Sequence, residues 1–136
     1  MKAYTDINQS KKLAEILPLE SADMYWLNRH IDLTETKYEV FVIDKSNKYI
    51  DFFNSYAVAI DNNEIIPCWS LAALLGILAN ETHNIDDDGY IILSSYKGNW
   101  WNISPINCIS EEIKESNNPL DAAFEMVVRL KQNGKI

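Results

Sequence analysis

One stretch of the chain, residues 65–79, contains no charged side chain, and its sequence is IIPCWSLAALLGILA. Pro67 has no amide hydrogen to donate and favours an extended conformation in the residue before it, so we expect a strand to end here. Ser70 is placed to cap a following helix, because its hydroxyl group can accept a hydrogen bond from a free amide of the first turn. The residues from Leu71 onward favour helix, and Asn80 is the predicted stop.

This predicted helix has no polar stripe, and a helix that is apolar on all sides is normally buried on all sides. About ten residues are too few to cross a membrane, which requires roughly 20. We therefore expect the helix to form the core of a folded domain, with no membrane partner. The alternative is a helix that is partly exposed in the monomer and covered in a homodimer, because an open apolar patch favours association.

Length, charge and motif content exclude several classes of function. The chain has 136 residues, the size of one domain, which can bury a core without disulfides or metal. Its formal net charge is −8, from 12 basic and 20 acidic side chains. Binding to nucleic acid relies on clustered lysine and arginine, so we expect no nucleic acid partner. The chain has no glycine-rich phosphate loop, zinc motif or serine nucleophile elbow, so we expect neither enzyme activity nor a cofactor.

The N-terminus and the cysteines indicate the cellular compartment. Residues 1–6 lack the apolar core of a signal peptide. Cys68 and Cys108 lie forty positions apart and form neither a metal-binding pattern nor a disulfide framework. We therefore expect a cytoplasmic protein with reduced thiols.

Local signals predict one helix and two strands in the first part of the chain. Thr5 or Asp6 can cap a helix, and Pro18 ends it. Strand-forming side chains then dominate two segments that are joined by a polar connection. The two strands are predicted at residues 22–30 and 38–44, and the connection at residues 32–37.

Residues 52–60 fit two patterns. One face of a helix would carry four apolar side chains, Phe52, Phe53, Tyr56 and Ile60, whereas residues 55–60 alternate as they would in a strand. We favour the strand at residues 55–60, followed by a turn at residues 61–63.

The second half of the chain predicts a hairpin and a final helix. Strands are predicted at residues 90–96 and 100–104 with a turn at 97–99, and a short helical turn at 111–115. Asn118 and Pro119 begin the last helix, which ends at Gly134. Three helices and about five short strands without βαβ alternation predict a single α+β domain, residues 1–136, with an antiparallel or mixed sheet packed by three helices.

Three segments, residues 5–24, 66–75 and 118–126, resemble a family of short uncharacterised proteins from anaerobic gut bacteria and their phages. The resemblance covers both ends and the middle of the chain. It implies a small cytoplasmic protein that is often encoded on mobile or phage-derived DNA. It brings no known activity and no catalytic residues.

An acidic loop carries part of a calcium-binding motif. Residues 84–89, Asn-Ile-Asp-Asp-Asp-Gly, match the first six positions of an EF-hand loop. The twelfth position, which supplies a bidentate Glu in that motif, is Ser95. The loop is therefore either a solvated turn or a Ca²⁺ site that uses Asp86 and Asp88.

Cys68 is the candidate nucleophile. At the N-terminus of the predicted core helix, the amide dipoles would lower the pKa of a thiol. Such a nucleophile also requires a base, and His30 and His83 are the only histidines. The alternative is that Cys68 is a small buried hydrophobic residue, which is the usual role of a free cysteine.

Adjacent tryptophans in the predicted hairpin are candidate partner contacts. Trp100 and Trp101 point to opposite faces of a strand, so one can reach the core while the other lies on the outer face beside Tyr96 or Lys97. An exposed tryptophan is a strong interface anchor, and the alternative is an aromatic pair across the hairpin. The candidate partner contacts are Tyr96, Trp100, Trp101, Asp86, Asp87 and Asp88.

These observations favour a non-enzymatic protein-interaction or regulatory domain that binds a protein partner or associates with itself as a homodimer. The negative charge suits a basic partner and predicts association that weakens with salt. Two alternatives remain open. One is a small thiol enzyme that uses Cys68 with a histidine, and the other is a Ca²⁺-stabilised binding module.

Overall fold

The computed structural model describes residues 2–32, 35–43, 52–82, 91–96, 100–105, 114–116 and 118–134. The described residues confirm the α+β class. They divide into two compact units, unit 1 with residues 1–5 and 70–136 and unit 2 with residues 6–69. The single domain of residues 1–136 stays a prediction.

Unit 2 contains α1 (Ile7–Ile16), the 3₁₀ helix η1 (Leu19–Ser21), β1 (Met24–Asp32), β2 (Glu35–Val42), α2 (Phe52–Ser55), α3 (Ala57–Asp61) and β3 (Ile65–Cys68). Unit 1 contains α4 (Leu71–Thr82), β4 (Ile91–Tyr96), β5 (Trp100–Pro105), β6 (Lys114–Ser116) and α5 (Pro119–Gln132).

The strands of the described residues form two separate sheets instead of one sheet of about five strands. Both sheets are antiparallel and three-stranded, with the orders β2-β1-β3 and β4-β5-β6. The prediction of a single sheet is therefore wrong, although the antiparallel pairing agrees with it. Local patterns identify strands, but they do not determine which strands pair over long separations in sequence.

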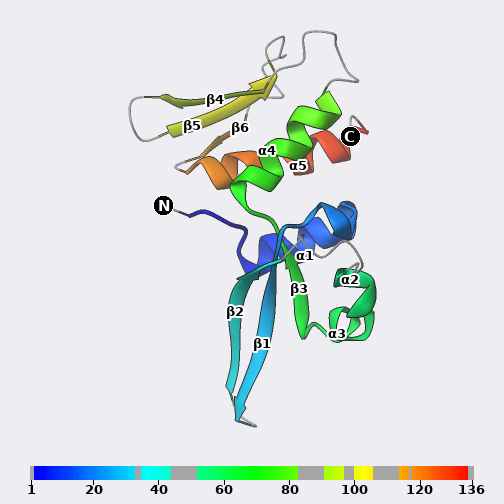
Figure 1. Ribbon diagram of the computed structural model, residues 1–136. Helices are drawn as coiled ribbons and strands as arrows, with labels where there is room; N and C mark the ends of the chain where they lie inside the picture. The colour runs from blue at the N-terminus through cyan, green and yellow to red at the C-terminus, as the bar shows by residue number, and fades with distance from the viewer. Residues whose placement is uncertain are drawn as a thin grey trace. The chain divides into compact units, whose positions relative to one another are not determined.

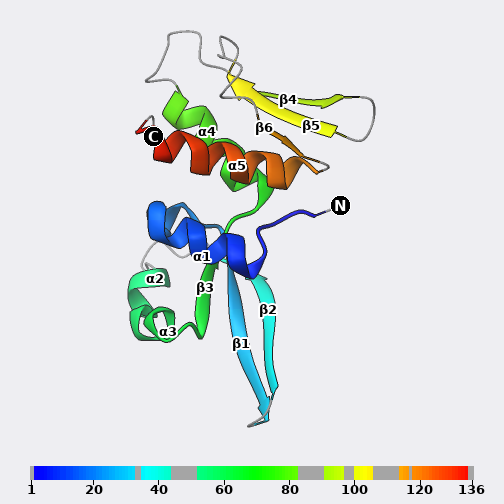
Figure 2. The same ribbon diagram turned by 180° about the vertical axis from the view of Figure 1, so that it is seen from behind.

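The sheet of unit 2 continues into a two-stranded arm. β1 pairs with β2 along its length, with an irregularity between His30 and Asp32, whereas β3 pairs only with residues 24–27. Figures 1 and 2 both show the β1 and β2 ribbon extending past β3. β2 begins at Glu35, so most of the segment 32–37 that we predicted as a connection belongs to the strands. Polar residues can continue a strand where the ribbon has no third strand and faces water.

The helix α1 begins and ends at the predicted signals. The Asp6 carboxylate accepts a hydrogen bond from the Gln9 amide at 2.8 Å, and the Gln9 side chain accepts one from the Asp6 amide at 3.1 Å. This reciprocal pair is a capping box. The helix stops at Ile16, just before Pro18. Of the two candidate caps, Thr5 and Asp6, the structure therefore uses Asp6.

The segment 55–60 is helical, so the predicted strand is wrong. Residues 52–55 form α2 and residues 57–61 form α3. Of the four residues on the competing helical face, Phe53 is buried, whereas Tyr56 is 48% exposed. The predicted turn at 61–63 is present, and Asn63 adopts a φ of 57°, a left-handed conformation that Asn tolerates better than most residues.

Most of the buried side chains of unit 2 belong to α1, β3 and the residues next to them. The indole Nε1 of Trp69 donates to the Oγ of Ser21 at 3.0 Å, and that hydroxyl donates to the carbonyl oxygen of Pro18 at 2.6 Å. This chain of bonds satisfies a tryptophan that is completely buried. The other buried apolar residues of the unit are Leu13, Leu17, Ala22, Phe53, Ile65, Ile66, Pro67 and Cys68.

In unit 1, α4 has the predicted start but not the predicted burial. Ser70 Oγ accepts a hydrogen bond from the Ala73 amide at 3.1 Å, which confirms the cap. The helix ends at Thr82, two residues past the predicted stop. Leu74 and Leu78 are buried, but three small residues along the helix, Ala72, Gly76 and Ala79, are exposed. A Cβ atom added at Gly76 would meet nothing within 4 Å. Burial on all sides is therefore wrong, because a row of small side chains offers little apolar area to cover.

The helix α5 is the most completely buried helix of the described chain. The Asn118 side chain accepts from the Asp121 amide at 2.8 Å, and Pro119 is at the start of the helix, as predicted. The Nζ of Lys2 lies 2.9 Å from Oδ1 of Asp121 and ties the N-terminal segment to this helix. Nine of its residues are buried: Pro119, Leu120, Ala122, Ala123, Phe124, Met126, Val127, Val128 and Leu130.

The second sheet lies in unit 1. β4 and β5 form the predicted hairpin, with Tyr96 paired to Trp100 and Ile91 to Pro105. β6 pairs with β5, so residues 114–115 are in a strand instead of the predicted helical turn. Antiparallel pairing to the neighbouring strand supplies the hydrogen bonds that a lone helical turn would leave unmade.

Candidate functional site

The acidic loop and one of the two histidines lie outside the described residues. Asp86, Asp87, Asp88 and His83 belong to the range 83–90, so the calcium and partner-contact predictions for this loop stay predictions. Elsewhere in the described ranges, no group of three histidine, cysteine or acidic side chains is arranged to hold a metal ion.

The paired tryptophans lie on the central strand of the second sheet. Trp100 is directly opposite Tyr96, and Trp101 has Ser95 on one side and Ser116 on the other. Tyr96 and Trp100 thus occupy facing positions in the register, as the alternative of an aromatic pair across the hairpin requires. The structure describes only the backbone of these residues, and their role as partner contacts stays a prediction.

Cys68 is enclosed and far from the nearest described histidine. Its exposed fraction is 0%, and it ends β3 instead of starting α4, which begins after the Ser70 cap. Cys68 is opposite Met24 on β1, whereas His30 is six residues further along that strand. Six strand residues span about 20 Å. This arrangement does not bring His30 within reach of the thiol as a base.

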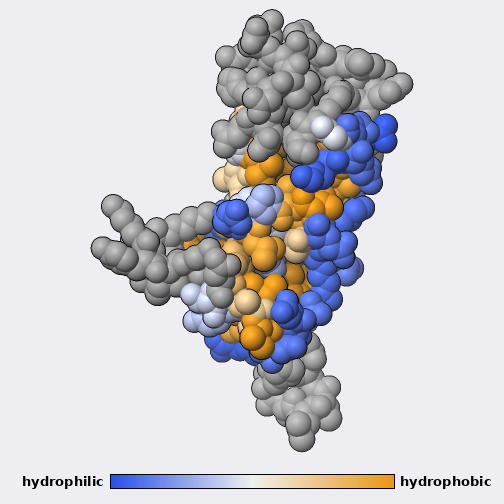
Figure 3. Space-filling model, turned by 90° about the vertical axis from the view of Figure 1, so that its right-hand side faces the viewer, coloured by the Kyte–Doolittle hydropathy of each residue, from blue (hydrophilic) through white to orange (hydrophobic). Residues whose placement is uncertain are grey.

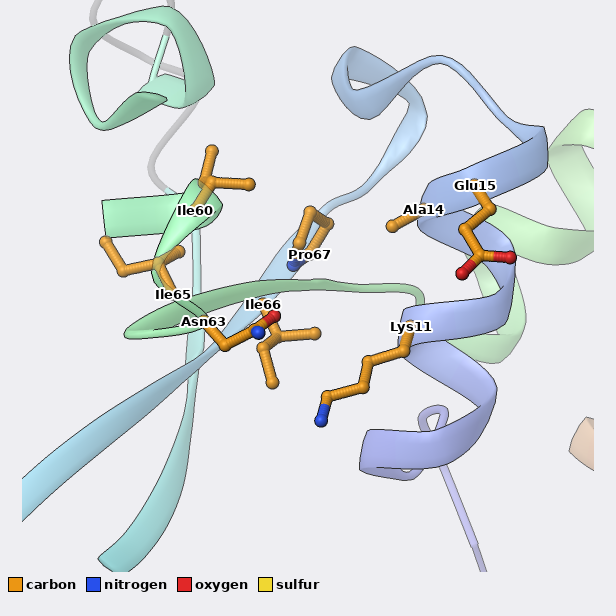
Figure 4. Close-up of a pocket in the computed structure, with 8 residues that line it drawn as sticks. All are labelled: Lys11, Ala14, Glu15, Ile60, Asn63, Ile65, Ile66 and Pro67. Carbon is orange, nitrogen blue, oxygen red and sulfur yellow. The ribbon is translucent and has the colours of Figure 1, made fainter. Parts of the chain in front are cut away.

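A pocket opens in unit 2 between α1, α3 and β3, with a volume of about 340 Å³ (Figure 4). Its apolar wall is formed by Ile60 and the strand residues Ile65, Ile66 and Pro67, and the three strand residues are themselves buried. The polar lining consists of exposed side chains at the rim. These are Lys11 and Glu15 on α1 and Asn63 after α3. The pocket thus combines an apolar interior with both signs of charge at its mouth.

Local structure explains why space remains at this position. Lys11, Ala14 and Glu15 are three and four positions apart, so they share one side of α1. The middle residue of this set, Ala14, has the smallest side chain and leaves the gap open. In Figure 4 these residues face Ile60 and Asn63 across β3, with Pro67 between the two sides.

Pro67 fits this position because of the direction of the strand's hydrogen bonds. The Asn28 amide donates to the Glu64 carbonyl oxygen at 2.8 Å, so alternation directs the backbone groups of residues 64, 66 and 68 toward β1. The nitrogen of Pro67 therefore faces away from β1, and no bond between the strands is lost. Proline is tolerated at such an edge position, where it also prevents another strand from pairing.

Two large apolar side chains are exposed on the segment that also supplies Ile60 to the pocket. Tyr56 is 48% exposed, and Val58 on α3 is 75% exposed. Figure 3 faces the side of the molecule that carries α2 and α3, and it shows hydrophobic residues at this surface among hydrophilic ones. Together with the pocket, these side chains form what we call the α3 site: Tyr56, Val58, Ile60 and the pocket-lining residues.

Sequence analysis missed the α3 site for a specific reason. Residues 55–60 were predicted as a strand, so Val58 and Ile60 were not placed on a helix beside Pro67. One available signal was Pro67 itself, since a proline within an apolar strand marks a sheet edge.

Comparison with known proteins gave no relative. No protein family, curated protein or solved structure matched the chain. In the described parts of the chain, no helix has the length and hydropathy of a transmembrane segment.

Proposed function

We propose that the protein is a non-enzymatic interaction module that receives an apolar side chain of a protein partner in the α3 site. The observation that carries this proposal is an apolar pocket of about 340 Å³ that is lined in part by Ile60 of α3, a helix that also carries a valine that is 75% exposed. Pockets of this size are at the small end of the range that accommodates ligands. One large side chain with its neighbouring backbone fits this volume better than an extended cofactor does.

The energetics of such an interface depend on a small number of anchors. Burying one large apolar side chain contributes about 1.5–3 kcal/mol, and most binding energy in protein interfaces comes from a few residues surrounded by a polar rim. Ile65, Ile66 and Pro67 would contact the anchor. Tyr56 and Val58 would extend the apolar contact outside the pocket, and Lys11 and Glu15 would form the rim.

The net charge of the chain indicates which class of protein partner it would bind. The formal net charge of −8 favours encounter with a basic protein. We propose that this encounter takes place in the cytoplasm and that its outcome is regulatory. The resemblance of three segments to short proteins of gut bacteria and their phages supports an origin on mobile DNA.

Two valines provide a matched test. A displayed library of random peptides is selected against the full-length protein, and the selected peptides are then titrated with two variants. Val58→Asp places a charge on α3, two positions from the pocket-lining Ile60, whereas Val42→Asp changes a side chain of nearly equal exposure, 73%, at the end of β2. We expect Val58→Asp to weaken binding roughly tenfold or more and Val42→Asp to leave it unchanged.

Two results would contradict the proposal. One is a set of selected peptides without an apolar anchor residue. The other is equal binding to the two valine variants, which would place the binding surface elsewhere.

A further inference from the structure

The outer edge of β2 offers unpaired backbone groups of a strand. The Ile43 amide donates to the Asp23 carbonyl oxygen at 2.9 Å, whereas the Asn28 amide donates to Glu64, next to β3. Backbone bonds alternate between the two sides of a strand, so the odd-numbered residues of β1 bond to β2. In the register of the pair, residues 37, 39 and 41 of β2 face β1. The amide and carbonyl groups of residues 36, 38, 40 and 42 therefore point outward.

Nothing else in unit 2 pairs with this edge among the described residues. β2 is the end strand in the order β2-β1-β3. Figures 1 and 2 show α2 and α3 on the β3 side of the sheet. An open edge of eight residues is a template for another strand.

The charges along β2 are arranged unfavourably within one chain. Lys37 is directly opposite Arg29 in the register, and like charges in opposite positions are destabilising. The Nε of Arg29 instead lies 3.3 Å from Oε2 of Glu39. An exposed Lys37 is left beside a cation of its own chain, and an anion on the outer side would relieve this repulsion.

A second copy of the chain supplies that anion in one particular register. Two β2 strands that run antiparallel overlap over the longest stretch when the symmetry axis passes through residue 38 or residue 39. An axis at residue 39 would place Glu39 opposite Glu39 of the second copy. An axis at Tyr38 places Lys37 opposite Glu39 of the second copy, twice by symmetry, in the closely spaced non-hydrogen-bonded positions.

We infer that the β2 edge binds a second copy of this chain, antiparallel and centred on Tyr38, to form a continuous sheet through both molecules. Residue 38 bonds to its own symmetry mate, and residues 36 and 40 bond to each other, giving about six backbone hydrogen bonds. Two strands bury much less than a standard interface, so the dissociation constant is on the order of 100 µM. This contact goes beyond the proposed function, because it uses the edge opposite to the α3 site.

Charge reversal tests the register in the full-length protein. Sedimentation equilibrium is measured up to about 1 mM, tenfold above the expected dissociation constant. Lys37→Glu makes both pairs between residues 37 and 39 of the two copies acidic, and Glu39→Lys makes both pairs basic. Because like charges then face each other, each variant alone should associate roughly tenfold more weakly than wild type or not at all. An equimolar mixture of the two variants has opposite charges at both pairs, and we expect it to form heterodimers with about the wild-type affinity.

The mixture separates this contact from a role of the charges in folding. Lys37→Glu removes the repulsion with Arg29, so its thermal unfolding temperature should not fall. The inference is overturned by a wild-type protein that stays monomeric at about 1 mM, in which case Lys37 and Glu39 protect the edge from pairing. It is also overturned by a Lys37→Glu variant that associates like wild type, or by a mixture that stays monomeric. These outcomes leave peptide binding at the α3 site unaffected, so the two proposals fail independently.

Discussion

The two edges of the unit 2 sheet are built in opposite ways. β3 has four residues, all of them buried, and α1 and α3 contact it. β2 has eight residues, alternates charged with aromatic or branched side chains, and ends in the exposed Val42. The β3 side presents side chains around a pocket, whereas the β2 edge presents backbone hydrogen-bonding groups. A single small sheet can therefore offer two different kinds of binding surface.

A single residue produces much of this difference. After Ile65, residue 67 is the only one of β3 whose backbone nitrogen points away from β1. This residue is Pro67, which has no amide hydrogen to offer to another strand. β2 contains no proline, so each of its outward residues keeps both a donor and an acceptor. One edge is thus protected from strand addition, and the other is open to it.

The comparison predicts very different reactivity for thiols on the two strands. In a Cys108→Ser background, Cys68 should react with iodoacetamide at least about a thousandfold more slowly than a cysteine introduced by Val42→Cys. The reason is that a completely buried thiol reacts only after the structure opens, which costs several kcal/mol. Mass spectrometry of timed samples gives both rates. Rapid modification of native Cys68 would contradict the closed β3 side and reopen the thiol-enzyme hypothesis.

Proline substitutions along β2 sharpen the comparison. Glu39→Pro removes an amide that faces β1, and we expect it to lower the free energy of unfolding by about 3 kcal/mol. Val40→Pro removes an outward amide and should cost only about 1 kcal/mol, mainly from the lost apolar side chain. Urea unfolding followed by circular dichroism measures both values. Equal losses at the two positions would mean that the alternation assigned to β2 is wrong.

Filling the pocket has the smallest expected effect on stability. Ala14→Leu adds apolar volume at the pocket wall and should raise the free energy of unfolding by about 0.5–1 kcal/mol while abolishing binding of the selected peptides. Lys12→Leu places the same side chain at an exposed neighbouring position of α1 that does not line the pocket, and it serves as the control. Calorimetric titration of both variants gives the result. Unchanged peptide binding by Ala14→Leu would argue against the α3 site.

Features that depend on a few neighbouring residues could be predicted from the sequence. The caps Ser70 and Asn118 were identified, and Asp6 was one of two candidates for the first cap, because a capping side chain acts on an amide within three positions. The hairpin of β4 and β5 was also predicted from a local turn signal. These features require no knowledge of the rest of the fold.

Features that depend on distant partners could not be predicted. The apolar pattern at 52–60 was compatible with helix and strand, and the structure has the helices α2 and α3 there. The uncharged α4 was expected to be buried on all sides, yet Ala72, Gly76 and Ala79 are exposed. Absence of charge does not require burial when side chains are small. The α3 site requires Ala14 and Ile65 to meet, and no local pattern encodes this contact.

Amide hydrogen exchange along β2, followed by NMR, tests the open edge most directly. In dilute protein, we expect the amides of Lys37, Glu39 and Phe41 to exchange at least about tenfold more slowly than those of Tyr38 and Val40, because only the first three are bonded to β1. At high concentration, Tyr38 and Val40 should become protected as well. Uniform protection of all five amides in dilute protein would show that the β2 edge is covered within one chain, which would contradict the distinction between the two edges.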